Sequence, residues 1–140
     1  MDSKKSLLVF KVVAWYISIY HAVLALIGTF AGPETVGAIA ARVYGITPYI
    51  TAQFAVTAKF ASAYMLAFAV MMGLVAYSPE KYRVFIYPAI VLFLLRIFDR
   101  IVYAGQINEA FGTTMSQNMV TIVIAAACAL LLYAFRPSAR

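Results

Sequence analysis

The sequence predicts an all-α protein, a four-helix transmembrane bundle that forms one domain over residues 1–140. The chain is 65% hydrophobic and 11% charged, whereas soluble domains average about 45–50% apolar and about 25% charged residues. Four apolar segments approach the roughly 20 residues that a helix needs to cross a hydrocarbon core. Turn-forming residues separate the segments. A water-soluble monomer, a disordered chain and a disulfide scaffold do not fit this pattern.

The four helices are expected at about residues 7–30, 49–77, 84–105 and 119–135. The first is expected to be retained and not cleaved as a signal peptide, because its apolar stretch is longer than the usual core of such a peptide. A short interfacial helix from Glu34 to Tyr44 is predicted between the first two spans. Pro33 is tolerated at a first helical position, and an acidic residue suits the N-terminal dipole.

Turns complete the predicted layout. Ser78-Pro79-Glu80 forms a tight connection between the second and third helices, and a loop from Phe111 to Asn118 leads into the fourth. A row of small residues on the fourth helix predicts a packing seam, either inside the bundle or with a partner. This row consists of Thr121, Ala125 and Ala129.

The positions of Lys and Arg at the helix ends predict the orientation, because cytoplasmic flanks carry an excess of these residues. Seven lie on the side that holds both termini, and Arg42 alone lies on the other side. Both termini are therefore expected in the cytoplasm, with the bacterial inner membrane as the expected location. The seven are Lys4, Lys5, Lys11, Lys81, Arg83, Arg136 and Arg140. Most of the net charge of +6 follows from this topology and does not indicate nucleic-acid binding.

Four charged residues fall inside predicted spans: Lys59 in the second helix, and Arg96, Asp99 and Arg100 in the third. A charge at mid-bilayer costs at least about 2.5–3.5 kcal/mol, so such residues usually face inward and are paired. The last three share one face with Tyr103 at spacings i, i+3, i+4 and i+7. The sequence therefore predicts one polar cluster in the bundle interior.

Small residues support an inward orientation, because they let helices approach closely in lipid. Lys59 shares a face with small residues, and so does His21, which has Tyr20 beside it. Lys59 and His21 are therefore expected to point into the bundle. The small residues are Ala52, Ala55, Ser62 and Ala63 in the second helix, and Ala14, Ser18, Ala25 and Gly28 in the first.

Three interpretations of the cluster stay open. It can be a packing clasp between helices, a pocket for a lipid headgroup, quinone carbonyl or small anion, or a proton or ion path. Three cations against one Asp99 leave a surplus of positive charge, and a buried unpaired cation is costly. A packing clasp is the more common arrangement, and this surplus of charge is the feature that a clasp does not explain.

No cofactor is predicted from the residues alone. His21 is the single histidine, which excludes a bis-histidine haem within one chain. It could still ligate a chlorophyll magnesium or a haem shared across a dimer, although a satisfied interior histidine is the more common case. Cys128 lies in an apolar run, where a buried and inert thiol is expected. Hydrolase, phosphate-loop and dithiol motifs do not occur in the sequence.

The overall pattern resembles the DoxX-like group of small bacterial membrane proteins. The similarity lies in four helices in about 140 residues, a Ser-Pro-Glu-Lys-Tyr-Arg turn, and a third helix ending Leu95-Arg96-Ile97-Phe98-Asp99-Arg100. The resemblance implies a quinone-linked subunit or an envelope-stress component. A weaker similarity, to the membrane-associated eicosanoid and glutathione protein family, rests on Arg100, Ala104, Gln106, Asn108 and Glu109, although in that family the signature lies in an early helix.

The sequence thus predicts an accessory or lipophilic-ligand-binding membrane protein that contacts the lipid bilayer and either other membrane subunits or a second copy of itself. The alternatives are an enzyme or carrier acting on a quinone, lipid or small anion in the charged cluster, and a pigment or haem subunit that uses His21.

Overall fold

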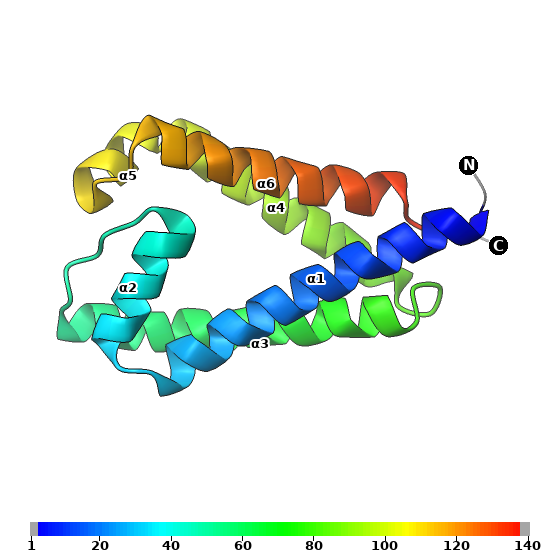
Figure 1. Cartoon of the computed structure of the whole chain (residues 1–140), viewed down its shortest axis with the longest axis horizontal. Helices are drawn as coiled ribbons and strands as arrows, with labels where there is room; N and C mark the ends of the chain where they lie inside the picture. Colours follow the sequence, from blue (N-terminus) through cyan, green and yellow to red (C-terminus); the bar gives the residue numbers. More distant parts are fainter. Residues whose placement is uncertain (1–2, 138–140) are drawn as a thin grey trace.

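The chain is helical along most of its length. The computed structural model describes residues 3–137, with side chains from Lys5 onward, and no strand occurs within that range (Figure 1). The all-α prediction is confirmed. Arg140, which was counted for the orientation, lies outside the described residues, as does the side chain of Lys4. The elements are α1 (Ser3–Phe30), α2 (Pro33–Tyr44), α3 (Ala52–Tyr77), the 3-10 turn η1 (Arg83–Phe85), α4 (Ile86–Val102), α5 (Ala104–Phe111) and α6 (Met115–Ala134).

Several of the expected helix ends shift by two to four residues, and two of these differences change the layout. The chain breaks at Tyr103 and forms α5, where no separate helix was predicted. The last helix begins at Met115, so the expected loop from Phe111 to Asn118 is shorter. The cause of the early start is a capping box, in which the Thr114 hydroxyl accepts from the Gln117 N–H and the Gln117 side chain accepts from the Thr114 N–H. This arrangement satisfies two N–H groups that the first turn would leave unpaired.

The helices form two pairs that make a wedge (Figure 1). One pair is α1 with α3, and the other is α4 with α6. The pairs meet near the chain termini and diverge toward the end that carries α2 and α5. The buried core lies where they meet. It includes Phe10 and Ile17 from α1, Met72 from α3, Ile86 from α4 and Leu132 from α6.

Small residues bring α1 and α3 close together. The predicted face of α1 is buried at all four positions, Ala14, Ser18, Ala25 and Gly28. A Cβ added at Gly28 would collide with the Ser62 hydroxyl oxygen, so only glycine allows this approach. The Ser18 hydroxyl donates to the Ala69 carbonyl at 2.8 Å and joins the two helices again. The seam on α6 is internal to the chain, because Ala125 and Ala129 are buried in the core.

The short helix α2 forms as predicted and begins at Pro33. It ends at Tyr44, and the following Gly45 adopts the left-handed conformation (φ 65°), which glycine permits at low cost. The residues that follow α2 are hydrogen-bonded to the end of α5 and to the connection between α5 and α6. The Thr113 hydroxyl donates to the Gly45 carbonyl at 2.8 Å, and the Thr47 N–H donates to the Phe111 carbonyl at 3.0 Å. These bonds hold α2 across the wide end of the wedge.

Three of the described helices are long and apolar enough to cross a membrane: Lys5–Phe30, Ala52–Tyr77 and Met115–Ala134. Less than a third of each span is buried inside the protein, and large apolar side chains cover the outer surfaces. Soluble monomers rarely expose apolar patches of more than a few hundred Å². The structure therefore has the surface of a membrane protein, with α4 (17 residues) as a shorter fourth long helix.

Candidate functional site

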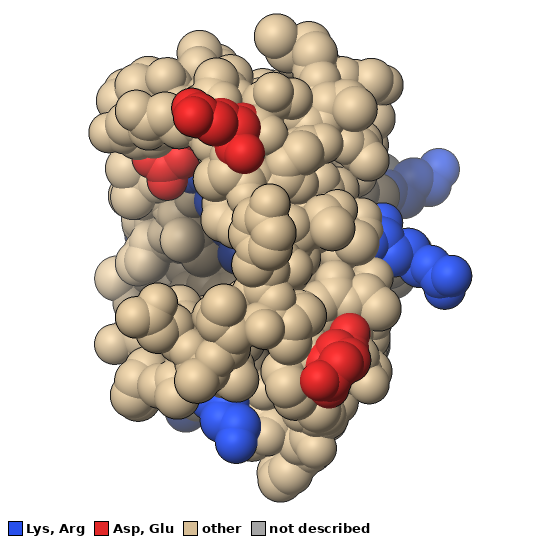
Figure 2. All heavy atoms as spheres, turned by 90° about the vertical axis from the view of Figure 1, so that its left-hand side faces the viewer, with Lys and Arg blue, Asp and Glu red and all other residues tan. Residues whose placement is uncertain are grey.

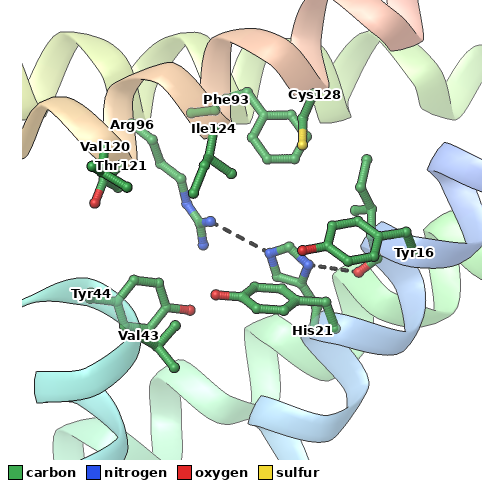
Figure 3. Close-up of a pocket in the computed structure, with 13 residues that line it drawn as sticks. Tyr16, His21, Val43, Tyr44, Phe93, Arg96, Val120, Thr121, Ile124 and Cys128 are labelled. Carbon is green, nitrogen blue, oxygen red and sulfur yellow. Dashed lines mark hydrogen bonds between the residues drawn. The ribbon is translucent and has the colours of Figure 1, made fainter. Parts of the chain in front are cut away.

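A cavity of about 240 Å³ lies between α1, α2, α4 and α6, on the open side of the wedge. Figure 2 views this end of the molecule and shows a hollow with Lys or Arg atoms in its depth. The lining is mostly aromatic and aliphatic, with one guanidinium and one imidazole (Figure 3). The lining residues are Tyr16, Ile17, Tyr20, His21, Val43, Tyr44, Phe93, Arg96, Val120, Thr121, Ile124, Ala125 and Cys128.

His21 is buried, with 3% of its surface exposed, and its ring is fixed by both nitrogens. Nδ1 lies 2.8 Å from the Ile17 carbonyl oxygen. Since a carbonyl only accepts, Nδ1 carries the hydrogen, and Nε2 is left as an acceptor. The Arg96 guanidinium lies 3.5 Å from Nε2 and donates to it. The edge of the ring meets Phe68 at a centroid distance of 4.8 Å. The predicted inward orientation of His21 is confirmed.

Arg96 reaches from α4 into the cavity, where Figure 3 shows its guanidinium between His21 and Tyr44. A guanidinium has five N–H donors and no acceptor, and its hydrogen bond to a described side chain is the one to His21. Among the described residues that line the cavity there is no Asp or Glu. The cation therefore faces a mostly apolar space, and no carboxylate among the described lining residues meets its remaining N–H donors.

Three tyrosines shape the cavity. Tyr16 and Tyr20 are one turn apart on α1 and stack with ring centroids 6.1 Å apart and an interplanar angle of 22°. Tyr44 enters from the last turn of α2, with its hydroxyl pointing into the space (Figure 3). Tyr103, which was expected to share the polar cluster, is instead exposed at the break between α4 and α5.

Arg100 has a different role from Arg96, although the two lie one turn apart on α4. Its guanidinium donates to Asn118 Oδ1 at 3.2 Å and to the Tyr44 carbonyl at 3.4 Å. Asn118 returns a bond of 2.7 Å from its Nδ2 to the Arg100 carbonyl. Asn118 is buried, so this reciprocal pair joins α4, α6 and the end of α2. Arg100 is a clasp between these helices and is not among the residues that line the cavity.

The predicted single cluster does not form, because Lys59 and Asp99 are both exposed. The expectation that Lys59 points into the bundle is wrong. On α3 the row that packs against α1 runs through Ala58 and Ser62, and the next residue on a helix points about 100° away. Of the small residues predicted to share the face of Lys59, Ala52 and Ala63 are exposed as well.

Asp99 is exposed for a similar reason. The buried stripe of α4 runs through Ile86, Ala89 and Phe93, and at helical spacing it continues to Arg96 and Arg100. Asp99 lies to one side of this stripe. The charged residues of α4 share a broad face, as predicted, but only the two arginines turn toward the other helices.

Two contributors to the site were not found from the sequence. Tyr44 was expected only as the last residue of the interfacial helix, and Asn118 as the last residue of a loop. The sequence carried a signal for the second, because Thr114 followed by Gln117 is a capping box. Once the helix starts at Met115, Asn118 falls on the same face as Ala125 and Ala129, which the structure buries.

The ring contacts of His21 do not fit a metal ligand. Nε2 faces the Arg96 cation and Nδ1 is bonded to Ile17, so a metal at either nitrogen requires one bond to break, and at Nε2 it meets a positive charge. Among residues 3–137 no three His, Cys, Asp or Glu side chains gather as metal ligands.

Comparisons of the chain with protein-family models, with curated proteins and with solved structures find no match. The geometry of the cavity is therefore the basis for assigning a function.

Proposed function

We propose that this chain is an integral membrane protein that binds a lipophilic ligand, whose oxygen-bearing headgroup lies in the cavity beside Arg96 and His21. The observation that carries the proposal is the Arg96 guanidinium, which faces an apolar space with a neutral imidazole as its bonded partner. A cation in such surroundings is costly unless an anion or a strong acceptor meets it. A ligand headgroup supplies that acceptor.

The size of the cavity fits a headgroup better than a whole ligand. Pockets for complete small molecules have volumes of about 300–1,000 Å³, whereas this one has about 240 Å³. Its lining places one guanidinium and a few hydroxyl groups among apolar and aromatic side chains, which is the usual composition of a site for an amphiphilic molecule. The charge favours an anionic headgroup, such as a carboxylate, over a neutral quinone carbonyl, because the site has a net positive charge.

In the proposed topology α4 is the fourth crossing helix. At 1.5 Å per residue, its 17 residues span about 25 Å, and η1 adds one helical turn directly before it. It packs along α6, which is long and apolar enough to cross, so it follows its neighbour through the bilayer. Both termini then lie on one side, for which the distribution of Lys and Arg favours the cytoplasm. The bacterial inner membrane is the corresponding location.

A quinone-linked activity is the second candidate, and the resemblance to the DoxX-like group favours it. A quinone carbonyl also accepts from a guanidinium, so the cavity admits both headgroups. A haem or pigment role is less favoured, because His21 Nε2 already accepts from Arg96. An accessory role in a larger assembly is compatible with ligand binding, and the exposed apolar faces leave room for a partner within the membrane.

The test compares two membrane-embedded cations of the same chain. The full-length protein is purified in mild detergent as wild type, Arg96→Met and Lys59→Met, and native mass spectrometry measures adducts with palmitate and with decylubiquinone. Lys59→Met is the matched control, since it removes an exposed cation that the described cavity lining does not include. Hydrogen bonds to charged groups contribute about 1.5–3 kcal/mol, so Arg96→Met is expected to weaken binding by about tenfold or more.

Each outcome has a clear meaning. Binding that falls in Arg96→Met and persists in Lys59→Met supports the site, and the probe that binds decides between a carboxylate and a quinone. Binding of neither probe, or equal binding by all three proteins, refutes the proposal. An absorption band of haem or chlorophyll in the purified wild type would instead support the pigment alternative.

A further inference from the structure

We infer that the ligand is a single-chain amphiphile with an anionic headgroup, and that its apolar chain lies in a groove on the outer surface of α1. This inference rests on the proposed function, because it assumes that the headgroup occupies the cavity beside Arg96. The groove is lined by Tyr16, Ile19, Tyr20, Val23 and Leu24.

The groove and the cavity are neighbours. Both are lined by Tyr16 and Tyr20, whose stacked rings form a wall between them. On one side of the wall lie His21 and Arg96, and on the other lie aliphatic side chains of α1. A molecule that passes the edge of these rings therefore has a cationic site at one end and the apolar groove at the other. This is the arrangement of polar and apolar parts in a fatty acid.

The pattern of α1 explains why the groove takes one chain. Tyr16, Tyr20 and Leu24 are four residues apart and form one ridge, while Ile19 and Val23 form the next ridge. The groove between two adjacent ridges of this kind is one side chain wide, and in helix packing it receives one row of side chains from a neighbouring helix. Here it is exposed, because Ile19 and Val23 are 57% and 49% accessible. It follows the helix for about 12 Å from Tyr16 to Leu24, at 1.5 Å per residue.

Charge selects the headgroup of this ligand. The described cavity lining contains Arg96 and no carboxylate, and His21 presents only an acceptor to Arg96. A carboxylate or phosphate oxygen can take the remaining guanidinium donors in a charge-assisted bond. Thr121 and Tyr44 add hydroxyl groups to the same lining. A neutral single-chain molecule would leave the cation uncompensated.

The test locates the chain directly. Palmitate that carries a photoreactive diazirine at mid-chain is added to the full-length protein in detergent and irradiated, and mass spectrometry of peptides identifies the labelled residues. Labels are expected on Ile19, Val23 or Leu24. They should disappear in Arg96→Met and persist in Lys59→Met, because the head must be anchored for the chain to be placed.

A second pair of variants tests the groove without changing the cavity. Val23→Trp fills the groove and is expected to abolish labelling of α1. Palmitate adducts are expected to persist in native mass spectra, because the cavity is unchanged. Val12→Trp is the matched control, since Val12 is an exposed residue of α1 (60%) that does not line the groove. It should leave the labelling pattern as in the wild type.

The two proposals can fail separately. Labels spread over α4 or α6, or labels on α1 that are equal in Arg96→Met, overturn the placement of the chain while Arg96-dependent adducts still support the cavity. Adducts with decylubiquinone but not with palmitate overturn the anionic single-chain ligand and leave the cavity as a headgroup site. Adducts with neither probe overturn both proposals.

Discussion

The close packing of α1 on α3 makes Gly28→Ala a sensitive test of the fold. A Cβ at this position would collide with the Ser62 hydroxyl oxygen and would lie 3.2 Å from Ser62 Cβ. The hydroxyl can rotate away only by giving up its 2.7 Å bond to the Ala58 carbonyl, which is worth about 1 kcal/mol. The helices must then separate slightly, and overpacking of this kind costs about 1–3 kcal/mol. We expect a total destabilisation of about 2–4 kcal/mol.

The assay is unfolding of the purified protein in detergent by increasing dodecyl sulfate, followed by circular dichroism. The matched control is Gly105→Ala, because a Cβ there meets nothing within 4 Å and alanine favours a helix by up to about 1 kcal/mol. Ser62→Ala removes the clashing oxygen, so Gly28→Ala should cost less in that background. A Gly28→Ala variant as stable as Gly105→Ala, or a cost unchanged by Ser62→Ala, would refute the packing of α1 on α3.

Three further predictions concern the polar residues. Asn118→Ala should destabilise the protein by about 1–3 kcal/mol, because it removes both bonds of the pair with Arg100, and the same dodecyl sulfate titration measures this loss. Thr114→Ala should cost about 0.5–2 kcal/mol through loss of the helix cap, and hydrogen exchange should rise in the first turn of α6 but not in its middle. Lys59→Met and Asp99→Asn should have additive effects on stability, with a coupling of less than about 0.5 kcal/mol, and a larger coupling in a double-mutant cycle would restore the single cluster that the sequence predicted.

Much of the fold could be predicted from the sequence, because its signals are local. Long apolar segments indicate helices whatever their neighbours, and Gly32-Pro33-Glu34 marks the start of α2 through backbone preferences alone. The row of Ala14, Ser18, Ala25 and Gly28 is inward-facing for a similar reason, since four small residues on one face have no role on a lipid surface. The helix α5 was missed because its break at Tyr103 involves neither proline nor glycine at that position.

The site was harder to predict, because it depends on how each helix is rotated about its axis. His21 was placed correctly, since the small residues around it are all on the contact face. Lys59 was placed wrongly, because small residues occur on more than one side of α3 and the sequence does not say which side meets α1. In the structure, the contact between Gly28 and Ser62 fixes the rotation of α1 and α3 about their axes.

The cations of α3 and α4 illustrate why charge counting alone did not identify the site. Counting treated Lys59, Arg96 and Arg100 as one surplus of positive charge, yet the structure separates them into three situations. Lys59 has a long apolar stem and an exposed position from which its ammonium group can extend along the surface. Arg100 uses its fork of donors to hold a carbonyl and an amide. Of these three cations, only Arg96 lines the cavity and has a neutral bonded partner, and for this reason the proposed ligand site is built on it.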